Sequence, residues 1–238
     1  MVKYPTCKGE LFNLASIASR LEKVRERMYE AAIRAGRNPE EITLVAVTKG
    51  VDAARIEEVL ELGIQDIGEN RIQEAEAKLP QIKRPCRRHL IGTLQRNKVS
   101  KALKHFDLIH SVDRIPLIER IAQRAGDQQT VDILLQVNVS GEASKHGVAP
   151  DELEVLAEAA AQHPNVRVLG LMTMAPLFEN PELARPTFAG LRELGARLNE
   201  LRLPNVTCQI LSMGMSGDFE VAIEEGATHV RVGSAIFA

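Results

Sequence analysis

The sequence predicts an α/β protein built as a single (β/α)8 barrel, a TIM barrel, with an additional N-terminal helix. Eight strand and helix patterns alternate over about 200 residues, which is the number of units that this barrel needs. The first strand-like run is apolar on both faces, as expected for a buried parallel strand. Because no long linker divides the chain, we expect one domain over 1–238, with the N-terminal helix in 1–40 and the barrel in 42–237.

The composition is that of an ordinary globular protein, with 238 residues, 45% of them apolar and 26% charged. The formal net charge of −2 gives no basic field for a nucleic acid. The three cysteines have neither metal-ligand spacing nor the pattern of a disulfide framework. The N-terminus lacks the apolar stretch of a signal peptide, and no run approaches the ~18 apolar residues of a membrane span. We therefore expect a cytoplasmic protein with no nucleic-acid or membrane partner.

The first predicted element is a long amphipathic helix over 11–34. Its apolar residues recur at spacings of three and four, and Gly36 and Pro39 follow its end. Such a helix precedes the first strand, so it can either cover one mouth of a barrel or pack in the outer ring.

The eight barrel units follow in order. Strands are predicted at 42–48, 66–68, 89–91, 108–110, 132–139, 166–171, 208–211 and 229–232, and helices at 53–62, 71–79, 95–103, 114–124, 150–162, 181–201 and 219–225. An open doubly wound sheet is the alternative. Eight units are more than such a sheet usually needs, and no Gly-x-Gly-x-x-Gly follows the first strand.

The first strand runs directly into Lys49. Ligand groups in a TIM barrel come from the carboxyl ends of the strands, so this lysine stands where chemistry is expected. Partial burial there favours the neutral amine and lowers the pKa of a lysine, and a neutral amine is what Schiff-base formation with a carbonyl compound requires. The alternative is a lysine that extends from the strand end into solvent.

Two turns rich in small residues follow the seventh and eighth predicted strands, at 212–217 (SMGMSG) and 232–234 (VGS). Such turns present backbone N–H groups and hydroxyls to an anion, and these loops form the recurrent phosphate site of this fold. In a closed barrel the first and eighth strands are neighbours, so Lys49 and both turns together suit a phosphorylated aldehyde. Ordinary turn chemistry is the alternative for each turn alone.

Eight ordered segments carry a family resemblance over 43–237: AVTKG, IGENRIQEA, HLIGTLQRNK, IHSVDR, QVNVSGEASKHGV, GLMTMAP, LSMGMSGDFEVAIEEG and VRVGSAIF. Together they resemble the pyridoxal 5′-phosphate (PLP) homeostasis protein family. Members of that family are single-domain barrels similar to the N-terminal domain of alanine racemase, the arrangement called fold type III among PLP-binding proteins.

The resemblance implies that PLP is the cofactor and that Lys49 holds it as an aldimine. It also implies roles for further residues: Ser212, Ser216, Gly233 and Ser234 at the phosphate, Arg231 facing the pyridine nitrogen, Asn70, His89 and Met174 around the ring, and Lys145 as a secondary cofactor-binding candidate. Two positions depart from the pattern. Val51 replaces a lysine that many bacterial relatives have two residues after the aldimine lysine, and Arg88 replaces a frequent tryptophan.

An arginine beside the pyridine nitrogen argues against efficient catalysis. Arginine stays protonated, so Arg231 keeps that nitrogen unprotonated and makes the ring a poorer electron sink. In the alanine racemase-like enzymes a tyrosine of a partner subunit's second domain supplies the second base, whereas the only tyrosines here, Tyr4 and Tyr29, precede the barrel.

We therefore expect a monomeric protein of intracellular PLP homeostasis that buffers PLP or delivers it to PLP-dependent apoenzymes. The alternatives are a weak amino-acid racemase or another PLP enzyme, and a class I aldolase-like barrel that forms its Schiff base with a sugar phosphate.

Overall fold

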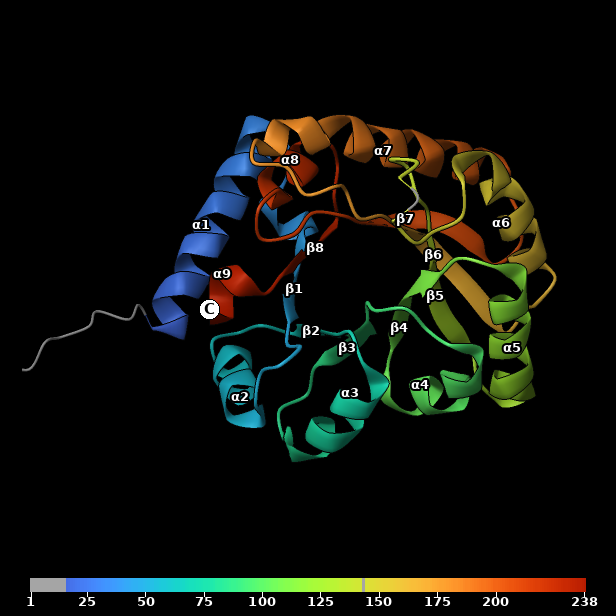
Figure 1. Ribbon diagram of the computed structural model, residues 1–238, viewed down its shortest axis with the longest axis horizontal. Coiled ribbons are helices and arrows are strands. Elements are labelled where there is room, and N and C mark those ends of the chain that lie inside the picture. Colours follow the sequence, from blue (N-terminus) through green and yellow to red (C-terminus); the bar gives the residue numbers. More distant parts are fainter. Residues whose placement is uncertain (1–15, 143) are drawn as a thin grey trace, which may run out of the picture.

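Eight parallel strands close into one barrel in the computed structural model, which describes residues 16–142 and 144–238 (Figure 1). The strands follow one another around the barrel in chain order, and β1 pairs with β8. The predicted (β/α)8 architecture is thus confirmed. The strands are β1 Thr43–Val47, β2 Asp66–Glu69, β3 Arg87–Leu90, β4 Leu108–Val112, β5 Val131–Gln136, β6 Val166–Met172, β7 Val206–Ser212 and β8 His229–Val232.

Helices surround the barrel on the outside (Figure 1). They are α1 Ile17–Arg34, α2 Ala53–Glu61, α3 Ile72–Lys78, α4 Val99–His105, α5 Ile115–Ala125, α6 Leu153–Ala161, α7 Arg185–Glu200, α8 Phe219–Glu224 and α9 Ser234–Phe237. Short 3-10 helices lie at Pro39–Glu41, Leu79–Gln81, Arg96–Lys98, Gly126–Gln128, Pro150–Glu152 and Pro181–Ala184. None of the helices in this part of the chain has the length and apolar character needed to cross a membrane.

Several predicted boundaries shift in the structure. The helices expected at 150–162 and 181–201 each begin with a 3-10 turn led by a proline, because proline fits the first position of a helix and 3-10 turns are frequent at helix ends. The strand expected over 132–139 ends at Gln136, and Val137 forms only an isolated bridge with Val148. The short helix α9 had no sequence prediction.

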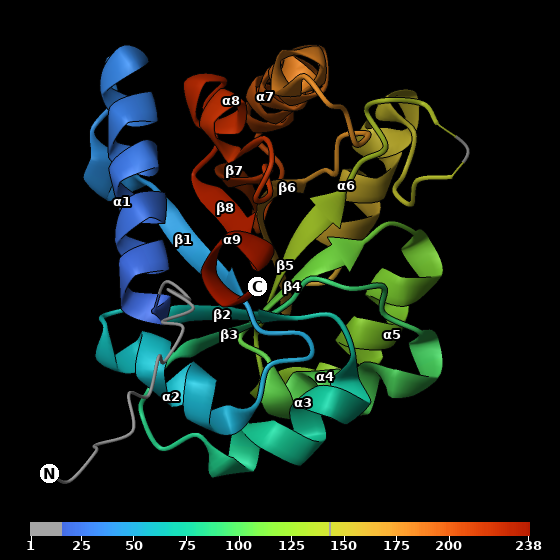
Figure 2. The ribbon, with the colours of Figure 1, turned by 60° about the vertical axis from the view of Figure 1, so that its left-hand side comes forward.

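Helix α1 packs in the outer ring rather than over a barrel mouth (Figures 1 and 2). It contacts α8, α9 and α2. The Arg20 Nε donates to the Ile236 carbonyl at 2.8 Å, and the Arg27 guanidinium binds both carboxylate oxygens of Glu220. Helix α1 therefore lies in the outer ring between α8 and α2. Residues 11–15 of the predicted helix lie outside the described residues.

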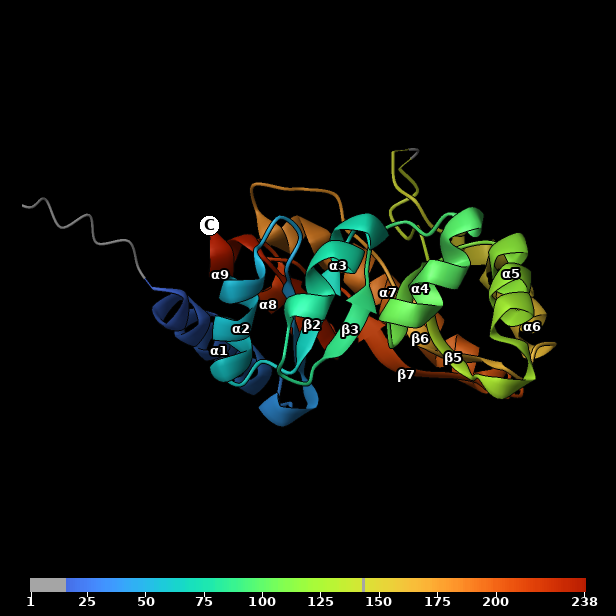
Figure 3. The ribbon, with the colours of Figure 1, turned by 90° about the horizontal axis from the view of Figure 1, so that it is seen from below.

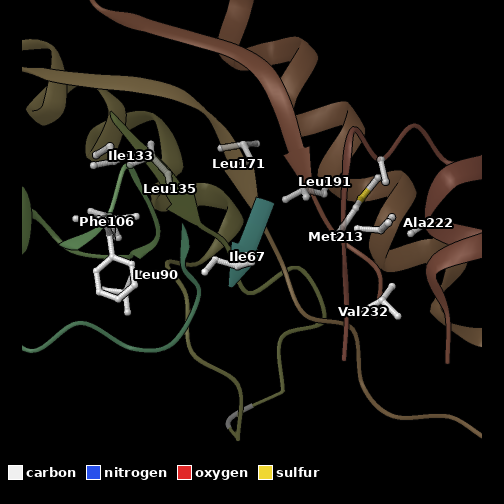
Figure 4. Close-up of a cluster of buried hydrophobic side chains, with 14 of the residues drawn as sticks. Ile67, Leu90, Phe106, Ile133, Leu135, Leu171, Leu191, Met213, Ala222 and Val232 are labelled. Carbon is white, nitrogen blue, oxygen red and sulfur yellow. The ribbon is translucent and has the colours of Figure 1, made fainter. Parts of the chain in front are cut away.

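The hydrophobic core occupies the layer between strands and helices. Figure 4 shows apolar side chains from several strands in this layer, among them Ile67, Leu90, Leu135 and Leu171, all fully buried. The barrel interior holds a much smaller apolar cluster of Leu108, Leu134 and Met172. Much of the remaining interior is filled by buried polar side chains, which can form hydrogen bonds inside the barrel.

The loops after β1, β5 and β6 all extend to one side of the barrel (Figure 3). This side is the carboxyl edge of the parallel strands, where the sequence placed the functional residues.

Candidate functional site

A cavity of about 360 Å³ opens at the carboxyl edge of the barrel. Seven of the ten residues nominated from the sequence line it: Lys49, Asn70, Met174, Ser216, Arg231, Gly233 and Ser234. They come from the ends of β1, β2, β6, β7 and β8 or the segments that follow. The closed barrel therefore brings together residues that lie up to 185 positions apart, from 49 to 234.

Lys49 stands in a turn directly after β1. The turn closes with a hydrogen bond from the Val51 N–H to the Thr48 carbonyl at 3.0 Å, and Gly50 adopts a φ of +69°. Thr48 is fully buried, whereas Lys49 is exposed. The partial burial that we expected for Lys49 is thus absent from this structure, because the side chain leaves the strand end at the wall of an open cavity.

Arg231 reaches the cavity from β8 and is almost fully buried, with 4% exposure. Its Nη1 donates to the Ser212 hydroxyl at 2.6 Å, and its Nη2 donates to the Thr173 carbonyl at 2.8 Å. Burial lowers the pKa of Arg231 to about 10, against a smaller opposing effect of Asp218. The guanidinium is therefore still protonated at neutral pH and presents a fixed positive charge to the cavity.

A chain of hydrogen bonds continues from Arg231 across the barrel interior. Ser212 Oγ lies 2.9 Å from His110 Nδ1, His110 Nε2 lies 2.8 Å from His89 Nδ1, and His89 Nε2 lies 2.8 Å from Asp66 Oδ1. The three linking side chains are completely buried, and Asp66 is 8% exposed. The five residues of this chain come from five different strands, namely β8, β7, β4, β3 and β2 in that order.

Chemistry fixes the direction of this chain. Arginine can only donate, and the hydroxyl of Ser212 has only Arg231 and His110 as partners among the described residues. The Ser212 proton is therefore donated to His110 Nδ1. His110 Nε2–H then donates to His89, and His89 Nε2–H donates to the Asp66 carboxylate. Burial is the largest cause that lowers the pKa of His110 well below its ordinary value, and the nearby Arg231 adds to it, which agrees with a neutral His110 ring.

The two turns rich in small residues are tied together at the cavity wall. Ser216 Oγ accepts hydrogen bonds from the N–H groups of Gly233 at 3.3 Å and Ala235 at 3.4 Å. Its own proton is left to donate to an oxyanion. The first turn is closed by Met215 N–H donating to Asp218 Oδ1 at 2.6 Å. Burial raises the pKa of Asp218, although this backbone hydrogen bond opposes the shift.

Asn70 lines the cavity and carries an unpaired polar atom. Its Oδ1 is buried and has no hydrogen-bond partner among the described residues. The backbone of Asn70 is held by a close approach of Gly92, where a Cβ atom would lie 2.1 Å from the Asn70 carbonyl oxygen. A buried unpaired amide at a cavity wall fits a ligand that carries a hydroxyl or another hydrogen-bonding group.

Three nominated residues lie away from the cavity wall. His89 was expected to line the ring pocket, but the structure places it in the barrel interior with both ring nitrogens paired. Ser212 lies beneath the wall, where it binds Arg231 instead of opening toward the cavity. Lys145 is half-buried in the segment between β5 and α6 and is not among the lining residues.

Other residues of the site were not nominated from the sequence. Five further residues line the cavity: Val47, Ile91, Leu177, Met215 and Gly217. Polar residues at strand ends, such as His110 and Thr173, turn out to support Arg231 and were visible in the sequence as polar groups where apolar caps are usual. Across residues 16–142 and 144–238, no group of three or more potential ligands could hold a metal ion.

Residues 13–238 match the family model of the alanine racemase N-terminal domain. The pyridoxal phosphate homeostasis protein of Aquifex aeolicus is 47% identical over 220 residues, covering 92% of this chain and 96% of that protein. The protein of the same name from Pseudomonas aeruginosa is 43% identical over 226 residues, covering 94% and 96%.

This chain belongs to the pyridoxal phosphate homeostasis protein family. The family resemblance stated from eight sequence segments is thereby confirmed. Among solved structures, PipY of Synechococcus elongatus with PLP bound has a TM-score of 0.81 and 36% identity, over 94% of this chain and 100% of that one. An alanine racemase of Clostridium difficile has a TM-score of 0.72 at 14% identity and covers 94% of this chain and 56% of its own, which shows the shared fold.

Proposed function

We propose that this protein binds PLP as an aldimine on Lys49 and serves to buffer or deliver the cofactor in the cytoplasm. The observation that carries the proposal is the convergence of Lys49, Arg231 and the two small-residue turns on one cavity. The PLP-bound structure of the relative PipY, which is 36% identical, supports it. PLP would supply an aldehyde, which condenses with an amine and releases water.

The residues of the cavity suit the three parts of this cofactor. Ser216, Gly233 and Ser234 would hold the phosphate, with the Ser216 hydroxyl as donor. The Arg231 guanidinium would meet the pyridine nitrogen, and the unpaired amide of Asn70 would bind a polar ring substituent while Met174 covers the ring. Lys145 and His89 would then act indirectly, since neither lines the cavity.

The arrangement favours holding PLP over turning it over. The guanidinium of Arg231 is charged and buried, and its two donated hydrogen bonds fix it in place. Such a group would keep the pyridine nitrogen unprotonated and weaken the ring as an electron sink. Among the described lining residues, Lys49 is the only conventional base, and Tyr29 is 57% exposed on α1. Efficient racemisation would need a second base on the opposite face.

The first experiment is the visible spectrum of the purified protein with PLP, before and after borohydride reduction. We expect a yellow protein whose absorption band disappears on reduction, with the reduced adduct on the peptide that contains Lys49. Lys49→Ala should lose the band and the adduct, whereas Lys145→Ala should keep both. An adduct on another lysine, or none in the wild type, would contradict the proposal.

Turnover assays over a panel of amino acids separate this proposal from a weak racemase. Robust racemisation that disappears in Lys49→Ala would identify an enzyme instead. An aldolase-like protein would differ in a third way, because borohydride would trap an adduct only after addition of a sugar phosphate. Light scattering of the purified protein tests the proposed monomer.

A further inference from the structure

A buried ion cluster lies beneath the turn that carries Lys49. Its centre is Lys78, the last residue of α3, whose side chain is 9% exposed. Lys78 Nζ lies 2.8 Å from Glu69 Oε1 and 3.0 Å from Glu74 Oε1. The Glu69 side chain is 1% exposed, and burial raises the pKa of that carboxyl although Lys78 opposes the shift. None of these three residues lines the cavity.

The cluster binds the backbone on both sides of Lys49. Lys78 Nζ donates to the carbonyl of Thr48 at 2.5 Å and to the carbonyl of Val51 at 3.3 Å. These two residues are the first and last positions of the turn. Lys78 thus holds both ends of the turn with one ammonium group.

The carboxylates hold the remaining polar groups of the same turn. Glu74 accepts a hydrogen bond from the Gly50 N–H, and the Thr48 hydroxyl donates to Glu69. Every turn residue other than Lys49 is therefore bound by the cluster. Among the described residues, no hydrogen bond involves the Lys49 side chain, which remains available to the cavity.

Burying these charges costs free energy of desolvation. The groups to which the cluster is hydrogen-bonded therefore indicate what it is for. A buried ion pair contributes little to stability compared with apolar residues of similar size, so stability alone is a weak reason for it. The hydrogen bonds of the cluster instead hold the backbone on both sides of one residue, Lys49. Covalent bond formation depends steeply on the alignment of the attacking group, so fixing this turn has a chemical consequence.

We propose that Lys78, together with Glu69 and Glu74, is a positioning residue that aligns the Lys49 amine for bond formation in the cavity. This inference rests on the proposed function and adds a specific requirement to it. In the step concerned, the Lys49 nitrogen forms a C=N bond with the aldehyde carbon, and the aldehyde oxygen leaves as water. Lys78 contributes to that step alone and not to the binding of phosphate or ring.

The test compares two ligands that differ only at the reacting carbon. PLP can condense with Lys49, whereas pyridoxine 5′-phosphate has a hydroxymethyl group in place of the aldehyde and cannot. The measured quantity is the dissociation constant of pyridoxine 5′-phosphate divided by that of PLP, which falls when PLP alone binds more weakly. In Lys78→Met we expect this ratio to fall about tenfold, the loss of a well-aligned charged hydrogen bond, while the affinity for pyridoxine 5′-phosphate stays within about twofold.

A matched control is Lys101→Met, which removes an exposed lysine that binds Glu76 at 2.9 Å. That variant should keep both affinities. If Lys78→Met is unfolded, Glu74→Ala decides, since Glu74 is one-third exposed and its loss frees the Gly50 N–H; the same ratio should fall, by a smaller factor.

The inference is wrong if the ratio is unchanged, or if both affinities fall in parallel, because a merely structural role would weaken both ligands alike. Failure of the proposed function looks different. In that case the wild type itself would bind PLP no more tightly than pyridoxine 5′-phosphate and would form no adduct on Lys49.

Discussion

At the scale of single residues, the site is a charged group supported by neutral ones. Arg231 is buried with a positive charge, Asp218 is the carboxylate whose charge acts on it, and Asp66 lies at the other end of the hydrogen-bonded chain. Ser212, His110 and His89 link the two charged groups by hydrogen bonds. This arrangement keeps the guanidinium fixed at the cavity wall and leaves no acidic group directly bound to it.

The direction of this chain predicts a specific tautomer. In this direction His110 and His89 each donate from Nε2 and accept at Nδ1, which long-range ¹H–¹⁵N correlation spectra of the ring nitrogens report directly. Ser212→Ala removes the donor to His110 and one acceptor of Arg231, and should lower the free energy of unfolding by about 1–3 kcal/mol. An Nδ1–H tautomer in the wild type would reverse the chain and contradict the assignment.

The sequence predicted which strand ends meet, but not how deep each side chain lies. Residues two apart on a strand share a face, and in a barrel they occupy successive layers. Ile91 lines the cavity, so His89, two residues earlier, lies one layer deeper in the interior. Ser212, the last residue of β7, does not line the cavity, whereas Ser216 in the following loop does. Depth depends on stagger around the closed sheet, which no local pattern encodes.

At the scale of elements, the turn between β7 and α8 depends on one glycine. Gly214 has a φ of +89°, and a Cβ there would lie 2.6 Å from the Ala222 Cβ and 2.9 Å from the Phe219 Cα. Its carbonyl accepts the Arg231 N–H at 3.0 Å, so the turn also holds the strand that carries the arginine. The small-residue pattern was visible in the sequence, whereas the packing against α8 was not.

Gly214→Ala should therefore destabilise the protein, through both the backbone conformation and the contacts with α8. We expect the free energy of unfolding without ligand to fall by about 2–4 kcal/mol in urea titrations. Gly217→Ala is the matched control in the same turn, since a Cβ there has no neighbour within 4 Å. Equal stability of the two variants would show that the turn tolerates a side chain at both positions.

At the scale of the whole molecule, the N-terminal helix α1 takes a place in the outer ring of helices. The amphipathic pattern predicted that helix α1 exists, but its place was open between the mouth and the outer ring. The structure places it in the outer ring, where α1 packs against α8, α9 and α2. These contacts join segments at opposite ends of the sequence, so the pattern of the helix alone does not predict them.

The polar barrel interior also predicts how stability depends on pH. His229 is 7% exposed, and burial, reinforced by the neighbouring Arg87 and opposed by Asp66, lowers its pKa to about 4. The unfolded chain therefore takes up a proton at this residue below its ordinary pKa of 6.5, before the folded protein does. Stability is full above that pH and falls as the pH drops toward about 4, where the folded state also becomes protonated.

The loss assigned to His229 over this range is up to about 3 kcal/mol, from the size of the pKa shift. His229→Gln removes the titrating group, so its free energy of unfolding should fall less steeply between pH 7 and pH 4.5 than that of the wild type. His110 shifts in the same direction and leaves part of the slope in place. His146→Gln, at an exposed position, should keep the wild-type slope. If all three proteins lose stability in parallel, the acid sensitivity arises from groups other than His229, and His229 is not buried as a neutral ring.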